Sequence, residues 1–156
     1  MRLALDEAED AAEAGEVPVG AVIVRDGEVI SRAANASVVS SDATAHAELL
    51  AIQAASAVTG DQRLAGCTLY ATLEPCAMCA GAIVLARLDR VVFGAWDKKA
   101  GMAGSVGDLL REPKLNHRPE VQGGVLESEC GALLSTFFRE KRGVAGSSAV
   151  EQPRKT

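Results

Sequence analysis

The chain has 156 residues, of which 48% are hydrophobic and 24% are charged, and its formal net charge is -5. This length fits one globular domain with its own core, and four cysteines are too few for a disulfide-rich scaffold. No apolar run approaches the roughly 20 residues that a membrane-spanning helix needs, and the N-terminus lacks a signal-peptide core. We therefore expect a cytoplasmic protein with no membrane segment.

The charges are spread unevenly along the chain. Residues 1–20 hold one basic and six acidic side chains, whereas residues 138–156 hold five basic and two acidic ones. A basic terminal segment can meet phosphate groups even on an acidic protein, because the field of the contacting face decides the attraction. The alternative is an ordinary solvated tail.

The first elements predicted are a helix and a hairpin. Residues 2–14 have high helix propensity, and Gly15 is expected to end that helix. Two strands, 19–24 and 28–31, flank a turn at 25–27, where the Asp-Gly pair tolerates the positive φ that hairpin turns require. The chain should therefore begin as a helix followed by an antiparallel pair.

Two further helices are predicted, and each begins at an unusual motif. The first spans residues 45–58 and ends at Gly60, with N-cap chemistry supplied by three polar residues, Ser41, Asp42 and Thr44. Its first turn contains "HAE" at 46–48. A strand at 67–73 precedes Pro75, and the second helix spans 76–87 and begins with "CAMC".

The rest of the chain predicts a buried strand at 90–95, a strand at 120–126 that paired glycines weaken, and an amphipathic helix at 127–142. Segment 97–119 has at most one helical turn, and loops of that length are usually functional or disordered. Residues 143–156 are small and polar, so we expect a disordered tail. The fold class is thus α/β, a single domain over 1–142 in which helices flank a sheet of about five strands.

The motif residues are suited to binding a metal. Cys76 and Cys79, three apart on a helix, lie about 60° apart around its axis, so both sulfurs can face one ion. His46 and Glu48 lie about 200° apart by the same arithmetic, so they can share a site only at the helix start. One imidazole and two thiolates suit zinc, and three protein ligands leave a fourth position for water, as in catalytic sites.

Each motif alone has simpler interpretations. A Cys-x-x-Cys pair is also typical of a redox centre, or of half a structural zinc site completed by Cys67, Cys130 or His117. A lone histidine at a helix start is usually a hydrogen-bonded structural residue. The two motifs together, each at a predicted helix start, favour a catalytic zinc site.

His-x-Glu followed by Pro-Cys-x-x-Cys resembles the signature of the zinc-dependent nucleobase deaminases. The resemblance implies a three-layer α-β-α sandwich with a mixed sheet. It also implies one Zn²⁺ per subunit held by His46, Cys76 and Cys79, with Glu48 as the catalytic proton carrier. From residue 2 to about 142 the chain is most similar to the bacterial tRNA-specific adenosine deaminases, through "EVPVGAV", "TLYATLEPCAMCAGAI", "RVVFGAWDKKAGMAGS", "NHR" and "LLSTFFREKR".

That similarity implies deamination of the wobble adenosine of a tRNA anticodon loop to inosine, by a homodimer whose "GAIVLAR" helix supplies an apolar face. A base in a loop is flipped without breaking a pair. The substrate-binding residues that it implies are Asn35, Ala47, Asp97, Asn116, His117 and Arg139. Phe137 and Phe138, as helix neighbours, are expected to divide between core and surface.

Many relatives carry an aromatic residue where this chain has Ala34, a proline where it has Ala43, and a basic or small residue where it has Trp96. None of these positions is a predicted metal ligand, so they bear on loop affinity or substrate range. Two other functions stay open at this point: an aminohydrolase for a free base or nucleoside, and a zinc-stabilised RNA-binding protein without catalysis.

Overall fold

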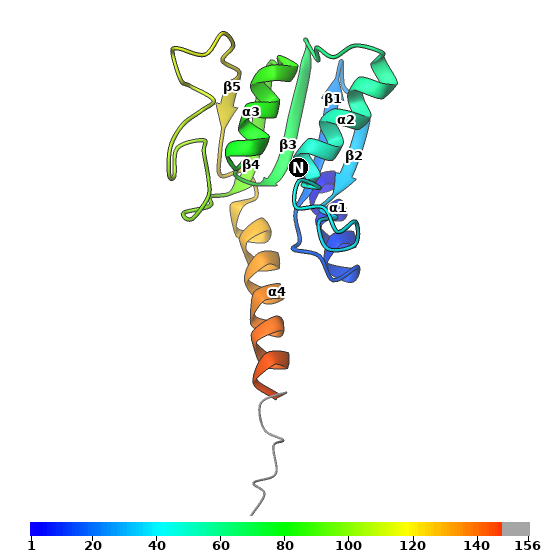
Figure 1. Ribbon diagram of the computed structural model, residues 1–156, viewed down its shortest axis with the longest axis vertical. Coiled ribbons are helices and arrows are strands. Elements are labelled where there is room, and N and C mark those ends of the chain that lie inside the picture. Colours follow the sequence, from blue (N-terminus) through cyan, green and yellow to red (C-terminus); the bar gives the residue numbers. More distant parts are fainter. Residues whose placement is uncertain (148–156) are drawn as a thin grey trace, which may run out of the picture.

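The structure is a computed structural model that describes residues 1–147. Within that range four helices surround a five-stranded sheet (Figure 1). The helices are α1 (Arg2–Glu13), α2 (Ala47–Thr59), α3 (Ala77–Ala86) and α4 (Glu127–Ser147). The strands are β1 (Gly20–Arg25), β2 (Glu28–Ala34), β3 (Cys67–Leu73), β4 (Arg90–Ala95) and β5 (Glu120–Gln122). No helix in this range is long and apolar enough to span a bilayer.

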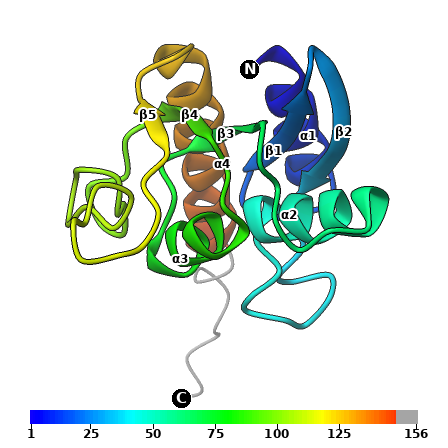
Figure 2. The same ribbon diagram turned by 90° about the horizontal axis from the view of Figure 1, so that it is seen from above.

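The sheet is mixed, as predicted. Its strand order is β2-β1-β3-β4-β5, in which β1 is antiparallel to β2 and β3, while β3, β4 and β5 are parallel. Helices α2 and α3 cover one face, and α1 and α4 cover the other (Figure 2). The predicted three-layer α-β-α sandwich is therefore confirmed. Parallel strands end at the same edge, so the loops after β3 and β4 emerge together there.

The opening hairpin forms as the Asp-Gly pair predicts. Arg25 pairs with Glu28, and the two residues between them have positive φ, 52° at Asp26 and 77° at Gly27. Two positive φ values define the turn whose twist matches that of the strands. The register shifts between Ile23 and Val24, which gives β2 one extra residue and a bulge.

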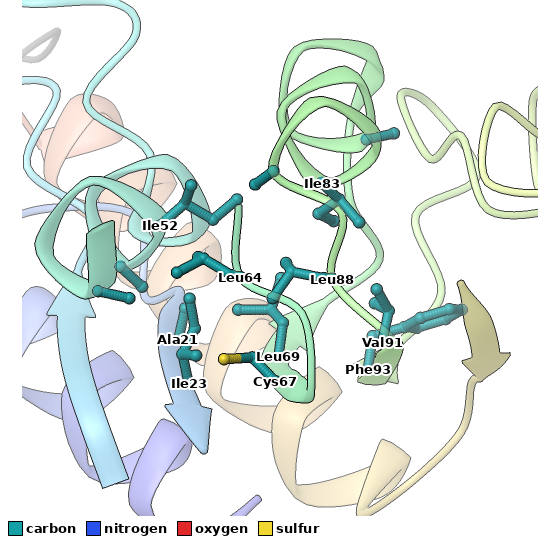
Figure 3. Packing of buried hydrophobic residues seen from close by; sticks show 14 of the residues in the cluster. Ala21, Ile23, Ile52, Leu64, Cys67, Leu69, Ile83, Leu88, Val91 and Phe93 are labelled. Atoms are coloured by element: carbon teal, nitrogen blue, oxygen red, sulfur yellow. The ribbon is translucent and has the colours of Figure 1, made fainter. Parts of the chain in front are cut away.

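The main core lies between the sheet and the α2–α3 layer. Branched aliphatic side chains meet there with small ones from both helices (Figure 3). Its fully buried members include Ile23, Leu64, Cys67, Leu69, Ile83, Leu88, Val91 and Phe93. Alanines at helix positions 47, 51, 55 and 80 allow close approach of helix to sheet, which is how a chain with few aromatics reaches core density.

The opposite layer packs through glycines. A Cβ at Gly20 would lie 2.0 Å from the carbonyl oxygen of Ala4, so α1 sits directly on β1. At Gly94 of β4 a Cβ would lie 2.4 Å from Sγ of Cys130, the buried thiol of α4. Each helix therefore contacts its strand at a position where no larger residue fits.

The predicted N-cap of the helix expected at 45–58, which is α2, is wrong. The helix begins at Ala47 with His46 as its N-cap, and no side chain caps it. Asp42 instead accepts hydrogen bonds from the backbone and hydroxyl of Thr44, at 2.8 and 2.7 Å. Aspartate commonly bonds the backbone two residues on, so these polar residues form a turn of their own before the helix.

The last two predicted elements differ in length. Strand β5 ends at Gln122 rather than 126, because the chain bends at Gly123 against the rings of Phe93 and Trp96 and continues through positive φ at Gly124 and Leu126. Helix α4 continues to Ser147, five residues beyond the prediction, since extending a formed helix costs little. Residues 143–147 are therefore helical, and the rest of the predicted tail, 148–156, lies outside the described residues.

Candidate active site

Two helix N-termini meet at one point. His46 is the N-cap of α2 and Cys76 is the N-cap of α3, both with extended backbone, while Cys79 lies in the first turn of α3. Nδ1 of His46 is 3.6 Å from the sulfur of Cys76 and 3.6 Å from that of Cys79. Within residues 1–147, His46, Cys76 and Cys79 form the group whose possible ligand atoms all lie within 4.8 Å of one another.

These spacings fit zinc. Zinc bonds of about 2.3 Å to sulfur and about 2.05 Å to nitrogen, set at the tetrahedral angle, leave the two ligand atoms about 3.6 Å apart. The observed sulfur–nitrogen separations are both 3.6 Å. One imidazole and two thiols are also a donor set that zinc prefers over harder cations. The chain therefore carries a site for one Zn²⁺, and the three predicted ligands are brought together.

Glu48 lies in the first turn of α2, the one part of the helix where it can share a site with His46. His46 has φ -79° and ψ 146°, outside helical geometry, so its ring reaches toward α3 while its carbonyl opens the helix. Glu48 follows in the first turn, with 4% of its surface exposed. The predicted placement of both residues at the start of the helix is confirmed. Two helix dipoles point their positive ends at the same site.

Burial and sulfur chemistry shift the pKa values at the site. Burial raises the pKa of the Glu48 carboxyl to about 7, so it can both take up and release a proton near neutral pH. A hydrogen bond from the Cys79 thiol lowers the pKa of Cys76 to about 5, and the same bond raises the pKa of Cys79. Cys76 is therefore the first of the two thiols to ionise.

A pocket of about 210 Å³ opens over this cluster. Apolar residues just before β1 and at the end of β3 form one part of its wall. Polar residues from the neighbouring loops and from the starts of α2 and α3 form the rest. The lining residues include Val17, Asn35, Ser37, His46, Glu48, Leu73, Glu74, Cys76 and Asp97. Two of the predicted substrate contacts, Asn35 and Asp97, thus lie in the same pocket as the zinc site.

The other predicted substrate residues do not line this pocket. Ala47 is fully buried in the core. Asn116 and His117 lie at the far end of α3, where the Asn116 carbonyl accepts from Arg87 and Nε2 of His117 is 2.6 Å from the Leu88 carbonyl oxygen. Arg139 lines a hollow farther along α4. Their contacts with substrate stay predictions.

Sequence reasoning missed two buried glutamates that build the pocket walls. Glu16 is 1% exposed, and its carboxylate accepts from the backbone of Val39 at 2.6 Å and from the Asn35 amide at 3.3 Å. It therefore fixes the loop after β2 and orients Asn35. Glu16 stands two residues before a proline inside an apolar stretch, and this setting is the sequence signal that could have identified it.

Glu74, also 1% exposed, organises the opposite wall. Its carboxylate accepts from the backbone of Asp97, Ala103 and Ser105 at 2.8, 3.1 and 3.0 Å, and from the Ser105 hydroxyl. Although burial opposes ionisation, these hydrogen bonds hold the pKa of Glu74 below its usual value. The Glu-Pro step of "EPC" is the matching signal in the sequence.

Comparison with known proteins agrees with this geometry. Residues 1–95 match the family model of the cytidine and deoxycytidylate deaminase zinc-binding region. The chain is 54% identical over 142 residues to the tRNA-specific adenosine deaminase of Bacillus subtilis, covering 91% of this chain and 88% of that protein.

Two solved structures extend the comparison. One comes from a study of A-to-I editing by tRNA:A34 deaminases at the wobble position of transfer RNA; it is 47% identical, with a TM-score of 0.83 over 86% of this chain and 97% of that one. The other is a guanine deaminase from Bacillus subtilis, 33% identical with a TM-score of 0.60 over 99% and 94%. With a family match over more than half its length and its predicted zinc ligands converging, the chain belongs to the cytidine and deoxycytidylate deaminase zinc-binding family.

Proposed function

We propose that the protein is a tRNA adenosine deaminase that hydrolyses the wobble adenosine of an anticodon loop to inosine, releasing ammonia. The observation that supports this proposal most directly is a buried glutamate beside a His-Cys-Cys cluster, in a chain with 54% sequence identity to a tRNA-specific adenosine deaminase. Zinc held by His46, Cys76 and Cys79 supplies the Lewis acid that activates water at neutral pH. The protein residues supply the proton transfers, the binding of the base and the exclusion of solvent.

Glu48 moves the protons. With a pKa near 7 its carboxylate takes one proton from the attacking water and passes it to the ring nitrogen of the base. It then takes the second proton from the hydroxyl group now bonded to the ring carbon and passes it to the amine, which leaves as ammonia as the carbonyl of inosine forms. Burial makes these transfers efficient, since few waters compete for the carboxylate at 4% exposure.

Asn35 and Asp97 hold the nucleotide. The Asn35 amide donates to Glu16, which leaves its carbonyl oxygen to accept from a purine amine. In Asp97, Oδ1 accepts from the backbone of Lys99 and Ala100 at 3.0 and 3.2 Å, which leaves Oδ2 to accept from a ribose hydroxyl. The pocket of about 210 Å³ suits one flipped base rather than a paired one.

The protein acts as a homodimer in the cytoplasm. Helix α3 has no charged residue, and its outer side carries Met78, Gly81 and Leu85, the last 81% exposed. A helix that is apolar all round is normally covered, and a second copy of the chain supplies that cover. The four cysteines are all unpaired, which suits a reducing compartment.

The test is substrate choice. Purified zinc-loaded protein is incubated with an anticodon stem-loop bearing wobble adenosine, and separately with guanine, cytosine, adenosine and cytidine. We expect inosine in the stem-loop and no turnover of the small molecules. Turnover of free bases alone would replace this proposal with the aminohydrolase function, which the 33% identity to a guanine deaminase favours as the second candidate.

A further inference from the structure

A groove continues from the active-site pocket along α4. It measures about 580 Å³ and shares Val17, Leu73 and Asp97 with the pocket over the zinc site. A second hollow of about 460 Å³ continues it, sharing Lys99, Leu134, Ser135 and Phe138. The three spaces therefore form one path from the zinc cluster to Arg139 and Arg142, which we name the α4 groove.

Trp96 stands where this path leaves the pocket. It follows β4 directly and precedes Asp97, and it is 43% exposed although tryptophan is usually well covered. Its ring meets Phe93 edge-on, with centroids 4.8 Å apart. Three glycines border the indole: a Cβ at Gly123 would lie 2.7 Å from its Cζ2, and at Gly104 and Gly124 at 3.4 and 3.9 Å from other ring atoms.

This setting holds the indole in place without covering it. Glycines bring two backbone segments against the ring, and Phe93 fixes its tilt, so its orientation is set before any ligand arrives. A preoriented aromatic surface loses little entropy on binding. Trp96 departs from the basic or small residue of many relatives, and the structure shows that Phe93 and three glycines fix its ring while it stays 43% exposed.

The charges along the α4 groove favour an anionic ligand. Lys98 and Lys99 line the groove beside Trp96, and Arg139 and Arg142 line its continuation, while Asp97 is the acidic residue in these two linings. On a protein of net charge -5 this is a local basic strip. Exposed aromatics within a basic groove are the arrangement with which proteins bind single-stranded nucleic acid, through phosphate neutralisation and base stacking.

We propose that Trp96 is a specificity-determining residue that stacks on a base next to the deaminated nucleotide while the α4 groove binds the following phosphates. The inference rests on the proposed function, because only a polynucleotide substrate has a neighbouring base. Phe138, 44% exposed and in the same groove, provides a second apolar surface farther along it. A free nucleobase or nucleoside would fill the pocket without reaching Trp96.

The first test uses Trp96 as its own probe, since it is the only tryptophan in the chain. Zinc-loaded protein carrying Glu48→Gln is titrated with the anticodon stem-loop, so that binding occurs without turnover. We expect saturable quenching of the tryptophan emission. Two abasic stem-loops, one lacking the base on the 5′ side of the wobble position and the other the base on its 3′ side, are titrated in the same way, and one of the two should bind about tenfold more weakly and leave the emission unquenched.

The second test compares substitutions in the active enzyme. Trp96→Leu should lower kcat/KM for the stem-loop about tenfold, and Trp96→Phe should keep most of it, because phenylalanine retains a stacking face. The matched control is Val58→Ala, which alters an apolar residue, 68% exposed, outside the groove and should change nothing. Zinc content and melting temperature show whether each variant is folded.

The outcomes separate the two proposals. Deamination of the stem-loop with unchanged emission, and equal affinity for both abasic stem-loops and the intact one, would overturn the role of Trp96 and leave the proposed function standing. If the wild-type protein neither binds nor deaminates the stem-loop, both proposals fall. The quenching experiment needs no substitution at Trp96, so a misfolded Trp96→Leu variant would not prevent a decision.

Discussion

At the scale of single residues, Glu48 combines two properties that usually conflict. It is a carboxyl group with 4% of its surface exposed, and it remains able to titrate because its pKa lies at about 7 rather than beyond the physiological range. Burial opposes its charged form most strongly, and the nearby charge of Cys76 opposes it too, whereas a backbone hydrogen bond, the His46 imidazole and the Cys79 thiol favour it. Proton transfer in both directions requires this balance.

Replacing Glu48 with glutamine should remove catalysis and keep the site. Glutamine has nearly the same volume but cannot carry a proton, so we expect kcat to fall by about 10²- to 10⁴-fold. Zinc content, measured by metal analysis, should stay at one ion per chain, since the three ligands are untouched. Retained activity in Glu48→Gln would exclude Glu48 from the proton transfers.

Glu74 makes a prediction about pH. In Glu74→Gln an amide NH₂ faces backbone N–H donors of the loop at 97–105, which should lower the free energy of unfolding by about 1–3 kcal/mol at neutral pH. The folded pKa of Glu74 is depressed, so its contribution is complete above the unfolded pKa of 4.5 and is lost as the pH falls through the lower folded value.

The difference in unfolding free energy between wild type and Glu74→Gln should therefore be constant from pH 6 to 8. Below about pH 4.5 the difference should decrease toward zero. Chemical denaturation at each pH measures it, and changes common to both proteins cancel. A difference that persisted at acid pH would mean that the charge of Glu74 is not what holds the loop.

At the scale of elements, the docking of α1 on β1 depends on one missing side chain. Gly20→Ala would place a methyl group 2.0 Å from the Ala4 carbonyl oxygen, so helix and strand must separate. We expect a loss of about 1–3 kcal/mol in unfolding free energy. Gly143→Ala is the matched control: it lies within α4 with nothing within 4 Å, so it should gain about 0.5–1 kcal/mol.

Thermal and denaturant unfolding of both variants measure the contrast. Equal effects of the two substitutions, in sign and size, would show that the close approach of α1 to Gly20 is not a constraint on the fold.

The elements that hold the metal cluster could be predicted because their signals are local. Proline at 75, glycine at 60 as a helix end and the 3.6-residue periodicity predict helices over 45–58 and 76–87, so His46 and Cys76 fall within two residues of the observed helix starts, and the Asp-Gly pair places the hairpin. The roles of Glu16 and Glu74 could not be predicted, because their partners lie 19 or more residues away along the chain and are brought to them only by the fold.

The predictions of the α2 N-cap and of the end of β5 were wrong for a related reason. A cap motif predicts the start of a helix when its side chain is free to bond the helix backbone, but Asp42 bonds Thr44 instead. Strand β5 ends where Gly123 meets the rings of Phe93 and Trp96, a contact between strands and loops that no local pattern contains. The groove along α4 is likewise a product of the whole fold.

At the scale of the molecule, the apolar side of α3 predicts association. Leu85→Glu places a charge on the 81%-exposed position of a helix that has no charged residue, so it should convert dimers to monomers. Sedimentation analysis at several protein concentrations measures the change, with Val58→Ala on α2 as the control. A dimer that survives Leu85→Glu unchanged would place the interface elsewhere.

Zinc joins the N-termini of α2 and α3, so its removal should destabilise the whole domain rather than the pocket alone. A ligand that binds only the folded state adds to its stability by mass action, and a chelator removes that contribution. We expect a lower melting temperature with chelator and recovery on adding Zn²⁺. An unchanged melting temperature would mean that the two helices are joined by packing alone.

The four thiols differ in how the fold and the metal protect them from alkylation. Cys67 and Cys130 are 0% and 1% exposed, and burial raises the pKa of both, so neither presents a reactive thiolate. Cys79 is likewise 0% exposed and has a raised pKa, so Cys76, which is only partly buried and has a pKa lowered to about 5, is the thiol that the metal alone protects. Alkylation should therefore proceed in two steps, one cysteine on loss of zinc and three more on unfolding, so counting modified thiols by mass distinguishes a demetallated enzyme from a denatured one.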